Sequence, residues 1–148
     1  MEVTFANRRD RLDALALGDG DLLRRLWRDV EEPEHELIRG PESGLVALRG
    51  RIGGGGAPFH FSEASVTRAS VRLADGRIGH ALALGRDTEK VRISALIDAM
   101  AQDEAAARQI ESKVVVPLRA ARRENDEKRA RKVAATKVDF FTLVRGDD

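Results

Sequence analysis

Three arginine side chains are the residues of this sequence best placed to bind an anion. Arg68 and Arg72 lie four residues apart on a predicted strand, so their α-carbons are about 13 Å apart on one face. Arg86 stands between Gly85 and Asp87 in a predicted turn from strand to helix, where backbone N–H groups can also bind an anion. We expect these three arginines to contact an anion or a nucleotide. The alternatives are a solvated strand face and a simple turn with a helix cap.

The sequence holds no complete set of catalytic residues. Cysteine is absent, which excludes disulfides, thiolate metal ligands and a cysteine nucleophile. The histidines, His35, His60 and His80, lack the spacing of a metal site, and we expect His80 to be a hydrogen-bonded core side chain. Glycines 53–56 are not followed by Gly-Lys-Ser/Thr and predict a flexible connector. We therefore predict no catalytic residue and no metal ligand.

An Asp75-Gly76 pair between two alternating apolar runs predicts a β-hairpin over residues 67–84. A two-residue turn with positive φ at both positions matches the twist of paired strands. This turn would pair Leu73 with Ile78, and the bulky apolar residues of both strands would share the face toward the core. The arginines at positions 68 and 72 would project from the opposite face, where no other side chain competes for them.

The remaining elements predict an α+β fold. Leucines at helical spacing predict two short helices, over residues 6–18 and 19–30, and a third helix begins after Asp87 and covers the sheet. Further strands are expected at 36–39, 45–52 and 59–61, and Pro117 is expected to break a helical stripe. We expect an antiparallel sheet of about four or five strands with helices on one face.

With 148 residues the chain is expected to form one domain, with a body at 1–117 and an interaction arm at 118–148. Residues 119–137 hold eight Lys or Arg against three Asp or Glu and predict a protruding basic helix. The residues that follow predict a strand with apolar side chains on both faces. A helix that is polar on nearly all sides and a strand with two apolar faces are both typical of segments that contact a partner protein. The predicted interface residues are Leu118, Val133, Phe140, Phe141, Val144 and Arg145.

Composition narrows the class of protein. The net charge of +1 predicts no general affinity for nucleic acid. No apolar run approaches the roughly 20 residues of a membrane helix, and the first residues are not a signal sequence, so we expect a cytoplasmic protein without membrane contact. Two alternatives stay open. The first is a nucleic-acid-binding module that uses the basic arm, and the second is a stand-alone phosphate-ester enzyme that uses Arg86 and His80.

Nine segments of the chain, in their order and spacing, resemble the PhnG subunit of the bacterial carbon–phosphorus lyase. The most specific are the Leu-Gly-Arg-Asp element and the Val-Asp-Phe-Phe-Thr-Leu-Val-Arg-Gly-Asp end, and the match spans most of the chain. The segments are Pro41–Val46, Gly53–Gly56, Phe59–Phe61, Thr67–Arg68, Val71–Leu73, Asp75–Gly76, Gly79–His80, Leu84–Asp87 and Val138–Asp147.

The resemblance implies an accessory role in phosphonate use during phosphate starvation, inside a core complex with PhnH, PhnI and PhnJ. With PhnI, PhnH and the ATPase-like PhnL, such a subunit supports transfer of a phosphonate onto the ribose C1 of ATP, with release of adenine. PhnI carries the nucleosidase chemistry, and PhnJ holds the iron–sulfur cluster and S-adenosylmethionine. The chain itself is then expected to bind no cofactor, to be inactive alone, and to self-associate when isolated.

Overall fold

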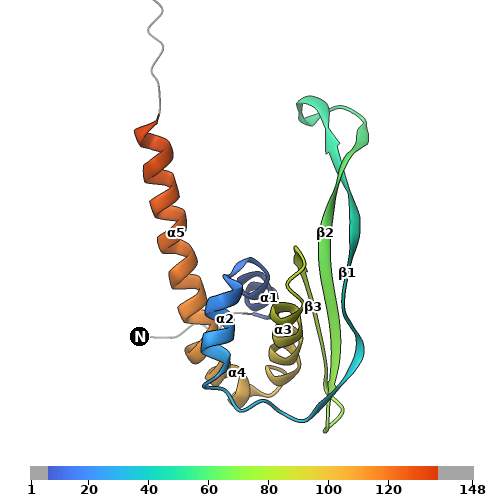
Figure 1. Cartoon of the computed structure of the whole chain (residues 1–148), viewed down its shortest axis with the longest axis vertical. Coiled ribbons are helices and arrows are strands. Elements are labelled where there is room, and N and C mark those ends of the chain that lie inside the picture. Colours follow the sequence, from blue (N-terminus) through green and yellow to red (C-terminus); the bar gives the residue numbers. More distant parts are fainter. Residues whose placement is uncertain (1–6, 137–148) are drawn as a thin grey trace, which may run out of the picture.

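Three antiparallel strands and five α-helices form an α+β fold in the computed structural model, which describes residues 7–136 (Figure 1). The sheet has the strand order β1-β2-β3, and α3 packs against all three strands. The fold class predicted from the sequence is confirmed. The elements are α1 (Arg8–Leu17), α2 (Gly20–Trp27), β1 (His35–Arg51), β2 (Pro58–Leu73), β3 (Ile78–Leu84), α3 (Thr88–Met100), α4 (Glu104–Ile110) and α5 (Val116–Ala135).

The described residues contain three strands, fewer than the four or five expected from the sequence. The segments predicted as separate strands at 36–39 and 45–52 are joined in the 17-residue strand β1. The segment at 59–61 likewise continues into the first strand of the predicted hairpin, and together they form the 16-residue strand β2. Gly40, which has a φ of +63°, and register shifts near it let the chain pass through the Gly-Pro sequence without ending β1.

The turn between β2 and β3 has three residues rather than the predicted two. The Leu73 N–H donates to the carbonyl of Arg77, and the Gly76 N–H donates to the carbonyl of Leu73. Gly76 alone has a positive φ, +92°. This is the three-residue hairpin with glycine in the left-handed position. The strands are therefore one residue out of the predicted register, with Arg72 opposite Ile78.

A shift of one residue turns every side chain of β3 to the other face of the sheet. Small residues of β3 therefore face the core, where Gly79 lies against α3 and Ala81 and Ala83 are buried. Their partners on β2 include Ala69 and Val71, which are also buried. The bulky residues of β3 face away from the helices. We call the side of the sheet that carries them the outer face, because α3 covers the opposite side.

The core lies between the inner face of the sheet and the helices. Its apolar residues are almost all aliphatic, and α3 is buried on nearly every side because it contacts the sheet as well as α1 and α2. Side chains cap the N-termini of the first three helices, since Asn7, Asp19 and Asp87 each accept a hydrogen bond from a backbone N–H three residues later. The predicted helices of the N-terminal region and the predicted Asp87 cap are confirmed.

Pro117 does not break the C-terminal helical region, contrary to the prediction. Helix α4 continues through a π-helical turn, η2 (Glu111–Val115), directly into α5, and Pro117 lies in the first turn of α5. A proline is tolerated there because the first turn of a helix leaves its N–H groups without intrahelical acceptors. Residues Val116–Ala135 form the 20-residue helix α5. Leu118, at its base, is 1% exposed and belongs to the core.

Two elements project from the same side of the body (Figure 1). One is α5, and the other is the part of β1 and β2 that extends beyond β3, residues 45–65, which we call the ribbon. The ribbon ends in a short 3-10 turn, η1 (Ile52–Gly54), followed by the remaining glycines. Within the part of the chain that the structure describes, no helix is both long and apolar enough to cross a membrane.

Candidate functional site

Arg68 and Arg72 lie on the outer face, as predicted, but each is held by a carboxylate of β1. Arg68 Nε is 2.7 Å from Glu42 Oε1, and Arg72 Nη1 is 2.7 Å from Glu36 Oε1. The expectation that no side chain competes for these arginines is therefore wrong. The two guanidinium groups line separate hollows of the surface. Their contact with an anion or nucleotide stays a prediction, and such a ligand would have to compete with both glutamates.

His80 also lies on the outer face and is exposed, so the expectation of a core histidine is wrong. Its Nδ1 is 2.8 Å from the hydroxyl oxygen of Ser70, its partner across the two strands. The one-residue shift of the hairpin explains this position. His80 contributes to the core through its backbone, because its N–H donates to the buried carboxylate of Asp98 at 2.9 Å.

The turn that carries Arg86 is tied down by hydrogen bonds. The Gly85 N–H donates to the carbonyl of Ser65, and the Thr67 hydroxyl donates to the carbonyl of Gly85, both at 2.8 Å. Gly85 has a φ of +94°, a conformation that favours glycine. The arginine itself is exposed, and within residues 7–136 no carboxylate forms an ion pair with it.

Asp87 occupies the N-terminus of α3, beside the turn where the sequence predicts an anion contact at Arg86. Its carboxylate accepts the Lys90 N–H at 3.0 Å and also binds Arg24 of α2, with Nη1 2.8 Å from Oδ1. Burial tends to raise the pKa of Asp87, but the Lys90 N–H and the Arg24 guanidinium outweigh it and lower the pKa overall. The carboxylate thus fills the position that an external anion would take, and this geometry favours a turn with a helix cap.

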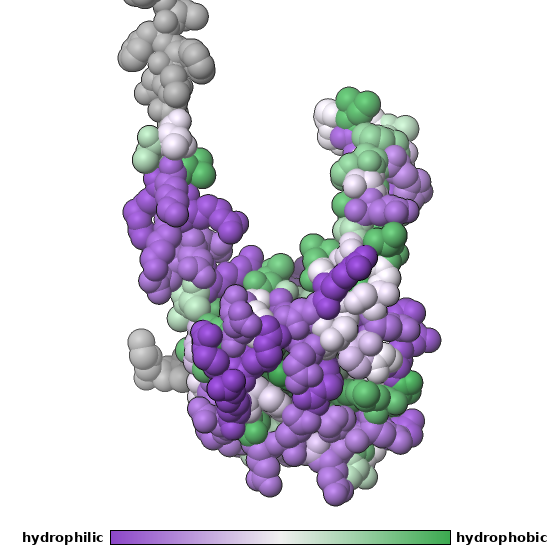
Figure 2. Space-filling model, in the orientation of Figure 1, coloured by the Kyte–Doolittle hydropathy of each residue, from purple (hydrophilic) through white to green (hydrophobic). Residues whose placement is uncertain are grey.

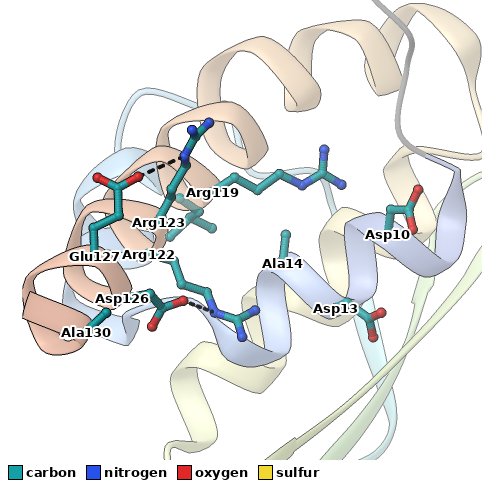
Figure 3. A pocket seen from close by; sticks show the side chains of 10 residues that line it. Asp10, Asp13, Ala14, Arg119, Arg122, Arg123, Asp126, Glu127 and Ala130 are labelled. Atoms are coloured by element: carbon teal, nitrogen blue, oxygen red, sulfur yellow. Dashed lines mark hydrogen bonds and ion pairs between the residues drawn. The ribbon is translucent and has the colours of Figure 1, made fainter. Parts of the chain in front are cut away.

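A groove of about 690 Å³ separates α1 from the base of α5 (Figure 3). Helix α5 contributes three arginines, and each has an acidic partner: Arg119 is 3.2 Å from Glu111, Arg122 is 3.7 Å from Asp126, and Arg123 is 3.1 Å from Glu127. Helix α1 contributes Asp10 and Asp13 to the opposite wall. A groove lined by both signs of charge suits a polar segment of protein better than a free anion.

The ribbon and β3 carry the largest exposed apolar side chains of the outer face. Figure 2 shows hydrophobic residues along the projecting ribbon, whereas hydrophilic residues cover α5. Five apolar residues follow one another on this face and form what we call the outer strip. They are Phe59, Phe61, Val46, Leu84 and Leu82, with exposed fractions of 42%, 58%, 38%, 68% and 58%.

Strand register shows that these residues share one face. Val66 pairs with Gly44 of β1 and with Leu84 of β3, so these three residues share one face. Val46 lies two residues beyond Gly44 on β1 and is therefore on the same face. Two further steps of two residues reach Gly50, and a Cβ atom there would meet the Phe61 ring at 3.0 Å. The rings of Phe59 and Phe61 are 6.0 Å apart and tilted by 56°. Gly50 therefore leaves room for the aromatic end of the strip.

A hollow of about 320 Å³ lies at the body end of the strip, bordered by Val46, Val66, Leu82 and the Arg68–Glu42 pair. Sequence reasoning missed the strip because it assigned the bulky residues of β3 to the core. The alternation of small and bulky residues along β3 is visible in the sequence. The small residues at positions 79, 81 and 83 are the signal that could have identified the core face, because they allow a helix to pack closely.

The predicted interface residues fall in three different settings. Leu118 is buried within this chain, packed beside Gly18, so the expectation that it contacts a partner is wrong for the structure described. Val133, near the end of α5, is 65% exposed and available to a partner. The other four, Phe140, Phe141, Val144 and Arg145, lie outside the described residues, as does the predicted terminal strand.

Comparison with known proteins identifies the family. The sequence profile described as "Phosphonate metabolism protein PhnG" matches residues 6–146. A relative from Rhizobium meliloti (strain 1021), named alpha-D-ribose 1-methylphosphonate 5-triphosphate synthase subunit PhnG, is 43% identical over 147 residues, which cover 97% of this chain and 92% of the relative. The resemblance found in the sequence is confirmed. This chain belongs to the PhnG family of phosphonate metabolism proteins.

Proposed function

We propose that this chain is an accessory, non-catalytic subunit of the carbon–phosphorus lyase core complex. With PhnI, PhnH and PhnL it supports the formation of ribose 1-phosphonate 5-triphosphate from ATP and an alkylphosphonate, with release of adenine. The observation that carries this proposal is the 43% identity to a synthase subunit over nearly the full length of both chains. That match also favours this function over a nucleic-acid-binding module and over a stand-alone phosphate-ester enzyme.

The arrangement of charged side chains supports an accessory role. The guanidinium groups of Arg24, Arg68, Arg72 and Arg92 are each bound to a carboxylate of this chain and stabilise its fold. In the proposed complex, ATP is the substrate, while the iron–sulfur cluster and S-adenosylmethionine belong to PhnJ. The chain itself binds no cofactor and works in the cytoplasm, in contact with PhnI, PhnH and PhnJ.

Helix α5 and the residues beyond it provide one contact with these partners. The test is co-expression of the chain with PhnI, PhnH and PhnJ, followed by purification through a tag on PhnI. A chain that ends after Arg123 keeps Leu118 in the core, and we expect it to fold but to leave the complex. A matched chain that ends after Thr136 separates the contribution of α5 from that of residues 137–148.

The truncation decides whether the arm contacts the partners, provided that each truncated chain is shown to fold when it is purified alone. Full recovery of the complex with the chain that ends after Arg123 would contradict a role for the arm. Failure of the full-length chain to co-purify with any of the three subunits would contradict the proposed function itself.

The predicted anion contact is tested separately. Arg86→Gln removes a charge that is not engaged in an ion pair within the described residues, so its effect on folding is expected to be small. For Arg68 the matched change is Arg68→Gln together with Glu42→Gln, which removes the pair without leaving a lone carboxylate. Lower synthase activity in an intact complex would support nucleotide contact, and full activity would assign these arginines to the surface alone.

A further inference from the structure

We propose that an extended segment of another subunit adds a fourth strand to the sheet, along the edge that β3 leaves open. The inference rests on the proposed function, because it names how a partner of the same complex binds. Strand β3 is an edge strand, since its neighbour β2 lies on one side only (Figure 1). The added strand would carry apolar side chains on both faces and one Lys or Arg.

Hydrogen bonds at β3 show which of its backbone groups point away from β2. The Gly85 N–H, directly after β3, donates to a carbonyl of β2. The His80 N–H instead donates to the side chain of Asp98 in α3. Because the direction of the backbone groups alternates along an antiparallel strand, those of His80, Leu82 and Leu84 all point away from β2.

One half of this edge is covered within the chain, and the other half is open. At the start of β3, Gln102 Nε2 donates to the Ile78 carbonyl at 2.6 Å, in addition to the bond that holds the His80 N–H. Further along, the N–H and carbonyl groups of Leu82 and Leu84 form no hydrogen bond within residues 7–136. An extended chain is the partner whose own backbone groups match such a row of donors and acceptors.

The two edges of the sheet differ in their protection against pairing. Exposed edge strands usually carry charges, prolines or bulges, which hinder the addition of another chain. Strand β1, at the opposite edge, has all three: charged residues, Pro41 and three register shifts. Strand β3 reads Ile-Gly-His-Ala-Leu-Ala-Leu, without Asp, Glu, Lys, Arg or Pro and without a register shift. The edge of β3 therefore has the properties of one that is paired in an assembly.

A hollow of about 270 Å³ lies beside this edge, between β3 and the helices. Helix α1 packs against β3 and α3, and its Leu12 and Ala16 line the hollow together with Val91 of α3. A strand paired with β3 would direct alternate side chains toward these apolar groups. The side chains between them would lie beside Leu82 and Leu84, which are exposed on the outer face. The occupant therefore needs apolar residues on both faces.

Asp13 determines the charge that suits the occupant. Apart from His80, the ionisable side chains that line the hollow are Arg8 and Asp13. The carboxylate of Asp98 already binds Arg8, with Nε 2.8 Å from Oδ1. Asp13 is exposed and forms no ion pair within the described residues. The hollow thus holds one uncompensated negative charge, which favours a strand that brings a Lys or Arg.

The same charge disfavours a second copy of this chain as the occupant. If two β3 edges paired about a two-fold axis, each copy would bring its own Asp13 to the seam. The arginine that lines the hollow, Arg8, is bound within each copy, so both carboxylates would lack a cation. A strand of another subunit is free of this restriction.

Amide hydrogen exchange tests the pairing directly. Exchange is measured by residue in the isolated chain and in its complex with PhnI, PhnH and PhnJ. We expect the amides of Leu82 and Leu84 to exchange rapidly in the isolated chain and about tenfold more slowly, or slower still, in the complex. The amides of Ala81 and Ala83 point toward β2 and serve as controls that are slow in both. Unchanged exchange at Leu82 and Leu84, or protection in the isolated chain, would overturn the proposal.

Two substitutions at one position separate the backbone from the side chain. Leu82→Pro removes an N–H that points away from β2, so the hairpin keeps its own bonds. Leu82→Ala keeps that N–H and shortens the side chain. Circular dichroism verifies each fold, and titration measures affinity for the other subunits. We expect a loss of about tenfold or more for Leu82→Pro and less than threefold for Leu82→Ala. Equal losses would assign the contact to the side chain and overturn strand addition.

Charge reversal on α1 tests the sign of the occupant. Asp13→Lys is expected to weaken binding about fivefold or more. Asp10→Lys is the matched control, because Asp10 lies on the same helix and lines only the groove toward α5. An equal loss in both variants would assign the effect to that groove and overturn the role of Asp13.

Photo-cross-linking identifies the source of the strand. With p-benzoylphenylalanine in place of Leu84, we expect a cross-link to an extended, apolar segment of another subunit that contains Lys or Arg. A cross-link to β3 or to residues 137–148 of this chain, in the same copy or a second one, would overturn the choice of partner. A cross-link to a helix of another subunit would overturn strand addition.

The failure of this inference differs from the failure of the proposed function. If the wild-type chain binds the other subunits while exchange at Leu82 stays unchanged, only the added strand is overturned. If the wild-type chain does not bind them at all, the proposed function and the added strand fail together.

Discussion

Gly79 of β3 lies so close to α3 that a Cβ atom at this position would overlap the carbonyl oxygen of Ala95 and the amide nitrogen of Ala99. Both are backbone atoms of a buried helix and cannot move without displacing it. This close approach seats α3 on the sheet, and it also leaves the bulky residues of β3 on the outer face.

We therefore predict that Gly79→Ala destabilises the protein by about 3 kcal/mol, because overpacking forces backbone shifts. The free energy of unfolding is measured by urea denaturation, with the single tryptophan, Trp27, as the fluorescent probe. Gly44→Ala is the matched control in strand β1 of the same sheet, because a Cβ atom there meets nothing within 4 Å. A loss of stability no greater than that of the control would contradict the close packing.

A buried carboxylate connects α3 to the start of α1. Asp98 has a side chain that is 0% exposed, and Arg8 binds it with Nε 2.8 Å from Oδ1 and Nη2 2.9 Å from Oδ2. Removing Arg8 leaves this charge buried with only backbone donors, so Arg8→Ala is expected to cost about 2 kcal/mol. Adding Asp98→Asn removes the unpaired charge and should recover part of the loss. If the double variant lost as much free energy of unfolding as the Arg8→Ala and Asp98→Asn variants lose together, this explanation would be contradicted.

The stability of the protein should fall in acid, and Arg92 is one cause. Its guanidinium donates hydrogen bonds to Glu32 and Glu89 and holds the pKa of both carboxyl groups below their ordinary value of 4.5. The folded state therefore binds fewer protons than the unfolded state. This contribution is fully present above about pH 4.5 and is lost as the pH falls through the lower values of the folded state.

Arg92→Gln should consequently flatten the dependence of the free energy of unfolding on pH below 4.5. The measurement is a series of urea denaturation curves between pH 3 and pH 7, at constant ionic strength. Arg25→Gln serves as the control, because Arg25 is exposed on α2 and forms no ion pair within the described residues. An acid profile of the Arg92 variant that coincides with that of the wild-type chain would contradict the role of this arginine.

Asp87 combines a helix cap with an ion pair, and two substitutions separate these roles. Asp87→Ala removes both and is expected to cost about 1 to 2 kcal/mol. Asp87→Ser keeps an oxygen for the Lys90 N–H but loses the pair with Arg24, so it should recover most of the stability. Thermal unfolding of the two variants provides the comparison. Equal losses would show that the ion pair, and not the cap, carries the effect.

Local signals in the sequence were sufficient for the fold class, most elements and the Asp87 cap. They were insufficient for the register of the hairpin, because Asp75-Gly76 is compatible with a two-residue turn and with the last two positions of a three-residue turn. The choice depends on what packs against β3. Only the close contact between Gly79 and α3 distinguishes the two, and this contact joins residues far apart in the chain.

The candidate surfaces were predictable to different degrees. The polarity of α5 marks it as a helix without a core face, so its projection from the body follows from its composition. The outer strip depends on the register of β3 and on a bulge near Phe61, and neither follows from the pattern of single segments. The partners of Arg68 and Arg72 were also missed, since Glu42 and Glu36 become their neighbours only when β1 pairs with β2.

The π-helical turn η2 inserts one residue beyond ordinary helical winding between the body and α5. Because each residue of an α-helix turns the chain by about 100°, an extra residue in a regular helix would rotate every side chain of α5 by roughly that angle about its axis. The wider π turn takes up the extra residue instead, so the arginines of α5 keep the direction in which they line the groove. Deletion of Ser112 would therefore return the segment to ordinary α-helical winding and leave the orientation of this 20-residue helix nearly unchanged.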